Sequence, residues 1–378
     1  MRVALLAATA LLGSCAALAP RVLRSFEGAG EDHLGVALAG PGDLDGDGRA
    51  DLLIGSVRGA FTTYGPGYVR AVSGASGATL HVARGRDEQD GFGETIVALG
   101  DVDADGFPDY GVPAVRSWSA YVRIVSGRTG DTVREVPAGF WHGDVAAAGD
   151  LDGDGHADVL VGSDGTTRAL CGASGAELWS AAAVPLGPVG DVDRDGTGDV
   201  LLVPLETWTL GPRAPYALVC SGRDGRVLAE LAMTDAGARP EASSCADLDG
   251  DGVAEVLGVR GARAFVASAR TGAVRTWVDG FRGIDDVRAA GDVDGDGTAD
   301  LLLALGRALA DIPLLTFGVG IASGRDGWPL VELRQRPFFV HGVASALGDV
   351  DGDWRAELAV TDADGGHAGR VHVVGFGL

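Results

Sequence analysis

Carboxylates recur in this chain at fixed offsets. Aspartate stands at positions 1, 3 and 5 of a nine-residue segment, and aspartate or glutamate stands at position 9. The pattern occurs seven times, and the first aspartates of successive copies are 41 to 58 residues apart. Acids at alternate positions of a tight loop direct their oxygens inward, and the glycine at position 6 of six copies permits the sharp turn. Such an oxygen cage suits Ca²⁺ better than Mg²⁺, which requires a stricter octahedron.

We predict five ligands in each copy, namely the side chains at positions 1, 3, 5 and 9 and the backbone carbonyl at position 7. This predicts up to seven Ca²⁺ ions and no other cofactor. The predicted metal ligands are Asp43, Asp45, Asp47, Arg49, Asp51, Asp101, Asp103, Asp105, Phe107, Asp109, Asp150, Asp152, Asp154, His156, Asp158, Asp191, Asp193, Asp195, Thr197, Asp199, Asp247, Asp249, Asp251, Val253, Glu255, Asp292, Asp294, Asp296, Thr298, Asp300, Asp349, Asp351, Asp353, Arg355 and Glu357.

The alternative is that these segments are only solvated Asp-Gly turns, because both residues are common in turns. However, the seven copies hold 28 of the 53 acidic residues, so the formal net charge of −23 would be about +5 without them. Four crowded carboxylates repel one another unless a cation lies among them, and this crowding recurs seven times. The acidity therefore indicates metal ligation, and nothing in it favours nucleic acid as a partner.

Apolar segments follow each acidic copy. Residues 52–54 read Leu-Leu-Ile and residues 159–161 read Val-Leu-Val, which is typical of short buried strands. An EF-hand would instead need glutamate at position 12 and a helix on each side. Position 12 is apolar or glycine in all seven copies, so we expect each acidic loop to join two strands.

A second unit recurs between the acidic copies, with the form strand, S-G-x-x-G, strand. Each repeat then contains four strands, two around the acidic loop and two around this glycine turn. Four-stranded units at this spacing predict an all-β fold, a seven-bladed β-propeller of antiparallel blades with one Ca²⁺ loop per blade. The glycine turns lie at residues 73–77, 126–130, 171–175, 221–225, 268–272 and 323–327, and two of them, at 171–175 and 268–272, depart from the full pattern.

The seventh repeat ends one strand short. After Glu357 the chain continues through residues 369–374 and stops without a glycine turn, while residues 21–26 at the other end have no repeat of their own. We therefore predict that Val22–Phe26 is the outermost strand of the last blade, antiparallel to residues 370–374. This arrangement would close the ring and pair both exposed edges.

Residues 91–93 (Gly-Phe-Gly), the acidic copy at 101–109 and residues 111–113 (Gly-Val-Pro) together resemble the FG-GAP repeat, which forms the seven-bladed head of integrin α chains. The resemblance covers about residues 20–378. It implies a Ca²⁺-stabilised binding propeller, used for adhesion or as a module of larger surface proteins. Trp354 replaces the loop glycine, and Glu255 and Glu357 replace aspartate, so the seventh site departs most from the pattern.

The N-terminus has the features of an export signal, with Arg2 followed by an apolar run over residues 3–12. We divide the chain into a signal peptide at 1–19 and a propeller at 20–378. Residues 12–15 also resemble a lipobox, which would make Cys15 a lipidated N-terminus instead. The protein is thus expected outside the cytoplasm, secreted or lipid-anchored. Cys171, Cys220 and Cys245 are interpreted as small buried hydrophobes.

No serine elbow, paired zinc-binding histidines or phosphate-binding glycine loop is present, so no catalytic residues are predicted. We expect a non-enzymatic binding or adhesion module, with a lectin or polysaccharide lyase as the alternative. A protein or glycan partner is expected on the face opposite the acidic loops, because the connections there vary in length and carry aromatic residues. Those residues are Phe61, Tyr64, Trp118, Phe140, Trp141, His142, Trp208, Phe281, Phe338, Phe339 and His341.

Overall fold

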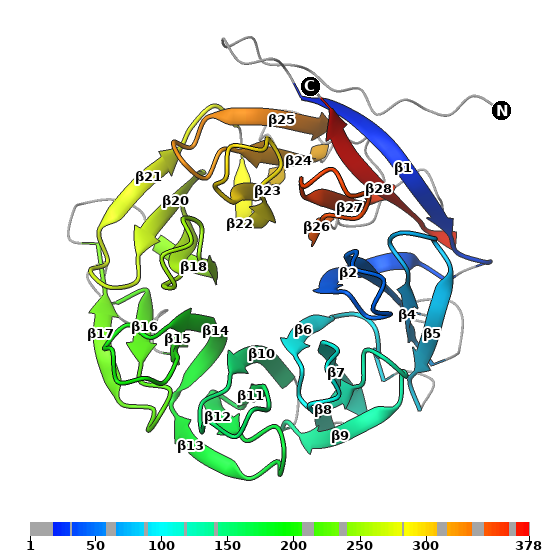
Figure 1. Ribbon diagram of the computed structural model, residues 1–378. Coiled ribbons are helices and arrows are strands. Elements are labelled where there is room, and N and C mark those ends of the chain that lie inside the picture. Colours follow the sequence, from blue (N-terminus) through cyan, green and yellow to red (C-terminus); the bar gives the residue numbers. More distant parts are fainter. Residues whose placement is uncertain are drawn as a thin grey trace, which may run out of the picture.

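The computed structural model describes residues 18–30, 32–57, 66–86, 90–116, 119–139, 143–205, 215–233, 240–281, 283–307, 316–334, 344–362 and 368–377. These residues form seven four-stranded antiparallel sheets arranged as a ring (Figure 1). The predicted seven-bladed β-propeller is therefore confirmed. Each acidic loop follows the first strand of its blade, so blades one to seven are numbered here by their acidic loops.

Blade one contains β2 (Leu34–Gly42), β3 (Asp51–Ser56), β4 (Tyr68–Val72) and β5 (Thr79–Arg84), and blade two contains β6 (Val97–Gly100), β7 (Asp109–Arg116), β8 (Ser119–Val125) and β9 (Thr132–Pro137). Blade three contains β10 (Gly143–Gly149), β11 (Asp158–Ser163), β12 (Thr166–Leu170) and β13 (Glu177–Ala181), and blade four contains β14 (Ala183–Gly190), β15 (Asp199–Pro204), β16 (Ala217–Cys220) and β17 (Val227–Leu231). Blade five contains β18 (Pro240–Ala246), β19 (Glu255–Arg260), β20 (Arg263–Ser268) and β21 (Val274–Val278), and blade six contains β22 (Ile284–Gly291), β23 (Asp300–Arg307), β24 (Thr316–Ala322) and β25 (Pro329–Arg334). Blade seven contains β26 (Ala344–Gly348), β27 (Glu357–Asp362), β28 (Arg370–Gly377) and β1 (Ala19–Glu27).

Burial changes across each blade in a way that the sequence explains. The second strand has an apolar centre, and in blade one every residue of β3 is buried, including Asp51 and Ser56 at its ends. The outer strand β5 alternates between polar and apolar stretches and is mostly exposed or half-buried, with Thr79, His81 and Arg84 as its polar residues. A strand that is buried on both faces needs apolar residues throughout, whereas an edge strand tolerates polar ones.

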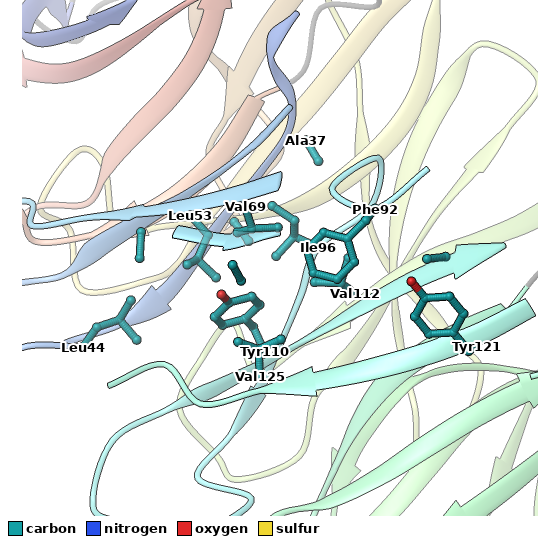
Figure 2. Packing of buried hydrophobic residues seen from close by; sticks show 14 residues of the cluster. Ala37, Leu44, Leu53, Val69, Phe92, Ile96, Tyr110, Val112, Tyr121 and Val125 are labelled. Atoms are coloured by element: carbon teal, nitrogen blue, oxygen red, sulfur yellow. The ribbon is translucent and has the colours of Figure 1, made fainter. Parts of the chain in front are cut away.

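The hydrophobic core is divided into seven clusters, one at each interface between neighbouring blades. Figure 2 shows the cluster between blades one and two, where Leu53 and Val69 pack against Tyr110 and Val112. No blade can bury its apolar faces alone, because each cluster takes residues from two blades. The ring is therefore the folding unit.

Residues from the two ends of the chain complete the last blade. β1 pairs antiparallel with β28, with Val22 opposite Val374 and Phe26 opposite Val371 (Figure 1). β1 is thus the outer strand of blade seven, which is the position expected for residues 21–26. Leu18, immediately before β1, is buried in the cluster between blades six and seven.

The remaining expectations about the fold concern cysteines and membrane segments. Cys171 and Cys220 are buried and Cys245 is half-buried, and none of the three forms a disulfide. In the part of the chain that the structure describes, we find no helix with the length and apolar character needed to cross a membrane. The export signal and Cys15 lie outside the described residues.

Candidate metal centres

The carboxylate at position 1 organises the backbone of each acidic loop. In loop one, Asp43 Oδ1 accepts hydrogen bonds from the backbone N–H of Gly46 at 2.7 Å and of Asp47 at 3.2 Å, and its Oδ2 accepts one from Gly48 at 2.8 Å. The two glycines have φ of +80° and +82°, the left-handed region that glycine adopts most readily. The carboxylate at position 1 therefore holds the loop in its tight form.

The acid at position 9 links the loop to the glycine turn of the same blade. Asp51 is fully buried, and its two oxygens accept separate backbone hydrogen bonds, from Leu44 at 2.6 Å and from Gly74 at 2.8 Å. The sequence predicted this residue only as a ligand. The turn glycine also donates to the position 9 acid in four further blades, through the pairs Gly127–Asp109, Gly172–Asp158, Gly222–Asp199 and Gly324–Asp300.

The buried acids at position 9 are poorly compensated electrostatically. Burial raises the pKa of Asp51 and Asp109 to about 6, and that of Asp300 and Glu357 to about 7. Neighbouring carboxylates of the same loop add to this rise, since like charges disfavour ionisation. A cation in the loop would act in the opposite direction by favouring the charged form.

The carboxylates also converge in space. Single oxygens of Asp43, Asp45 and Asp51 all lie within 4.8 Å of one another. The same separation holds in other loops for the sets Asp101–Asp103–Asp109, Asp150–Asp152–Asp154 and Asp191–Asp193–Asp199. The donors are oxygens from short acidic side chains, which is the set that hard divalent cations prefer.

Loop seven departs from this scheme at two places. Trp354 occupies position 6 with φ of +70°, and its N–H still donates to Asp349 at 3.2 Å, so the loop keeps its shape. Glu357 is 1% exposed, and its Oε1 has no hydrogen-bond partner. In this blade β28 continues straight to pair with β1 where the other blades turn, so the turn glycine that would donate is absent. An unpartnered buried oxygen fits a cation in loop seven.

Comparison with known proteins agrees with this geometry. The FG-GAP repeat model matches residues 142–176, a span that contains loop three and its glycine turn. Integrin alpha-4 of Xenopus laevis is 30% identical over 165 residues, which is 36% of this chain and 15% of that protein. Integrin alpha-5 of Xenopus laevis is 31% identical over 151 residues, 34% of this chain and 14% of that protein. This chain is a seven-bladed β-propeller that is similar to the FG-GAP repeat and to integrin α chains.

The chain thus corresponds to only about 15% of the length of these integrins. Solved structures share the fold of this chain over most of its length. A chain of the mitotic checkpoint complex superimposes with a TM-score of 0.57 at 11% identity, covering 97% of this chain and 98% of that one. BBS1N from its complex with ARL6DN gives a TM-score of 0.53 at 12% identity, covering 88% of this chain and 89% of that one.

Neighbouring acidic loops of the propeller are joined by backbone hydrogen bonds at position 8. Ala157 N donates to the carbonyl of Asp101 in the preceding loop at 2.8 Å. Ala50 N donates to Asp349 O at 3.1 Å, across the closure of the ring. Position 8 also donates to the preceding blade in the pairs Ala254–Val189, Ala299–Leu248 and Ala356–Asp292. Sequence reasoning missed these contacts, because the repeat shows which residues are equivalent but not which repeats touch.

The side chains at position 7 also reach the preceding loop. His156 Nδ1 lies 2.9 Å from the carbonyl oxygen of Val102, and Arg49 Nη1 lies 3.4 Å from Asp349 Oδ2. These side chains are thus engaged between blades, which agrees with a metal-binding role for only their backbone carbonyls. Of the aromatic residues expected on the opposite face, only Phe281 lies among the described residues, where it packs against the cluster between blades five and six.

Proposed function

We propose that this FG-GAP-type propeller is an exported, calcium-binding and non-enzymatic binding or adhesion module at or outside the cell surface. The observation that carries the metal assignment is the repetition of one preorganised acidic loop in all seven blades. The similarity to integrin α chains supports the binding role and the extracytoplasmic location. We propose lipidation at Cys15 as the means of attachment to a membrane.

The residues of each loop have separate roles in this proposal. The acids at positions 1, 3, 5 and 9 and the carbonyl at position 7 would hold the ion, which supplies positive charge at the centre of four carboxylates. The position 1 acid also shapes the turn, and the position 9 acid connects the loop to the neighbouring hairpin. Ion binding would therefore stiffen the whole loop face of a blade.

Thermal unfolding in EDTA and in millimolar Ca²⁺ tests the metal assignment. A ligand that binds only the folded state stabilises it by about 2.7 kcal/mol per site at a concentration 100 times its dissociation constant. We expect a large rise of the midpoint in Ca²⁺ and a smaller rise in Mg²⁺ at the same ionic strength. Equal midpoints in EDTA and Ca²⁺ would contradict a stabilising metal.

For the partner, we propose a protein or glycan bound on the face opposite the acidic loops. A hollow of about 480 Å³ lies beside blades two and three, where the inner strands begin, and its lining includes Glu94, Thr95 and, from blade four, Pro185. The most exposed aromatic side chains among the described residues lie elsewhere: Trp328 directly follows a glycine turn, and Trp354 lies in an acidic loop. Variants on the two faces can therefore show which face binds the partner.

A glycan array, a screen of extracellular proteins and an activity assay on acidic polysaccharides would identify the class of partner. We expect Thr95→Trp, which fills the hollow, to weaken partner binding, and Trp354→Gly on the other face to leave it unchanged. The reverse result would move the binding surface to the loop face. Turnover of any polysaccharide would replace the binding module with the lyase alternative.

A further inference from the structure

One position of the outer strand is bulged in every blade. In blade one, Ala71 pairs with His81 and Val72 pairs with Thr79, so Leu80 has no residue opposite it. A bulged residue leaves the regular alternation of the strand, and its side chain can be aimed independently. The bulged residues of blades one to seven are Leu80, Val133, Leu178, Leu228, Arg275, Leu330 and Leu23.

Six of these side chains are apolar and have the same environment. Each packs, half-buried, against the hydrophobic cluster between its own blade and the next. The seven repeats can be compared with one another at this position. In six blades its side chain has the same function, which is to cover the hydrophobic cluster. Arg275 in blade five is the exception.

Arg275 reaches the acidic loop of its own blade. Its Nη1 lies 2.6 Å from Asp249 Oδ2 and 2.8 Å from Glu255 Oε1. These acids occupy positions 3 and 9, two of the four carboxylates that would share an ion. The Glu255 side chain is only 7% exposed, so one guanidinium nitrogen bridges a half-exposed carboxylate and a buried one.

Two further differences accompany the arginine in blade five. Position 9 is glutamate where most loops have aspartate, and the turn residue that follows the serine is Ala269 where five blades have glycine. In those five blades the turn glycine N–H donates to one oxygen of the position 9 acid. In blade five Arg275 donates to that acid, and the longer Glu255 side chain brings its oxygen to the guanidinium.

We propose that Arg275 is the built-in cation of loop five, and that this loop does not take up Ca²⁺. The inference rests on the proposed function, since it concerns which of the acidic loops bind metal. The guanidinium is always charged, and its donors match carboxylates well. An incoming ion would have to displace it and leave a charged group without its partners.

Arginines near other loops do not satisfy the same geometry. Arg226 of blade four contacts one ligand carboxylate, Asp193, at 2.8 Å, and leaves the position 9 acid to its backbone donors. In loop seven Arg21 and Arg49 each contact a single carboxylate, at 3.0 and 3.4 Å. The unpartnered Oε1 of Glu357 there remains available to a cation. Loop five keeps the full acidic pattern, but it is therefore the loop in which an arginine takes the place of Ca²⁺.

Native mass spectrometry of the full chain tests this inference, after removal of metal with EDTA and return of Ca²⁺. We expect six ions per wild-type chain and seven in Arg275→Leu, which carries the residue found in most other blades. Arg226→Gln is the matched control. It removes an ion pair to a ligand carboxylate of loop four, but it does not make a further loop available to Ca²⁺. It should bind the same number of ions as the wild type.

The difference of one ion between Arg275→Leu and the wild type is the decisive readout. Seven ions in the wild type, or equal numbers in the two proteins, would overturn the inference while leaving the calcium assignment intact. The absence of bound Ca²⁺ from both proteins would overturn the inference together with the proposed function. Should Arg275→Leu fail to fold, Arg275→Gln provides the same comparison with a polar side chain.

Discussion

Trp354 stands where the other six acidic loops have glycine, with φ of +70° and with 89% of its surface exposed. A left-handed backbone costs a residue with a Cβ about 1–2 kcal/mol relative to glycine. The side chain recovers little of this free energy by burial. Loop seven nevertheless keeps the hydrogen bond from position 6 to Asp349, so the fold imposes the conformation on an unfavourable residue.

Replacing this tryptophan should therefore stabilise the protein. We expect Trp354→Gly to raise the free energy of unfolding by up to about 1 kcal/mol, since part of the relieved strain is offset by the greater freedom of glycine in the unfolded chain. The matched control is Gly297→Ala, at the same position of loop six with φ of +87°, which should lower it by about 1–2 kcal/mol. Chemical denaturation in EDTA measures both. Destabilisation by Trp354→Gly would show that the indole has a structural role.

His81 is a residue whose protonation state should matter between two blades. Its ring stacks on Tyr110 of blade two with centroids 6.1 Å apart, and Nε2 lies 3.3 Å from the tyrosine hydroxyl. Burial lowers the pKa of His81, and the charge of Asp131 opposes this shift only in part. Protonation therefore favours the unfolded chain over the folded one.

The sign of the pH dependence follows from this shift. The contribution of His81 to stability is complete above its ordinary pKa of 6.5 and is lost as the pH falls through the lower pKa of the folded state. We expect His81→Phe to lose less stability than the wild type between pH 7 and pH 5, in the same concentration of EDTA. Comparing the two proteins cancels the acids that titrate in both. Parallel stability curves would exclude His81 as the titrating group.

At the scale of the element, the position 9 acid connects two hairpins in addition to its proposed role as a metal ligand. Asp109 accepts hydrogen bonds from Val102 N at 2.8 Å and from Gly127 N at 2.9 Å, so one side chain connects two hairpins of blade two. Sequence periodicity predicted both hairpins and the acid, because each recurs in the repeat. It could not predict the bond between them, because repetition records which residues are equivalent and not which segments touch. The bulged position of the outer strand escaped prediction for the same reason.

The two roles can be separated by comparing Asp109→Ala with Asp103→Ala. In EDTA, Asp109→Ala leaves two buried N–H groups without acceptors and should lower the free energy of unfolding by about 2–4 kcal/mol. Asp103 is exposed, so its removal should be neutral or slightly stabilising in EDTA, because one of the crowded charges is lost. In Ca²⁺ both variants should fall below the wild type. Equal effects in EDTA would mean that the acids have only one role.

At the scale of the whole molecule, the decisive property is that each cluster of the hydrophobic core is built from the side chains of two neighbouring blades. The number of repeats predicted seven blades, and the missing strand of the seventh repeat indicated where the ring closes. The hydrogen bonds that connect successive acidic loops were beyond prediction, although one of them, from Ala50 to Asp349, crosses the closure itself. Closure therefore involves the loop face, the core cluster between blades seven and one, and the strand pair β1–β28.

Deleting β1 tests how far the ring depends on its closure. Without residues 18–27, β28 becomes an exposed edge, and Leu23 and Phe26 no longer cover the cluster between blades seven and one. An unpaired edge beside an apolar surface invites association with other chains. We expect a much lower thermal midpoint and concentration-dependent aggregation, both in EDTA and in Ca²⁺, because metal in the loops cannot replace the strand. Deletion of residues 1–17 is the control and should leave the midpoint almost unchanged. If the two deletions behaved alike, the six complete blades would hold the ring without its closing strand, and the propeller would be stabilised blade by blade rather than as a closed circle.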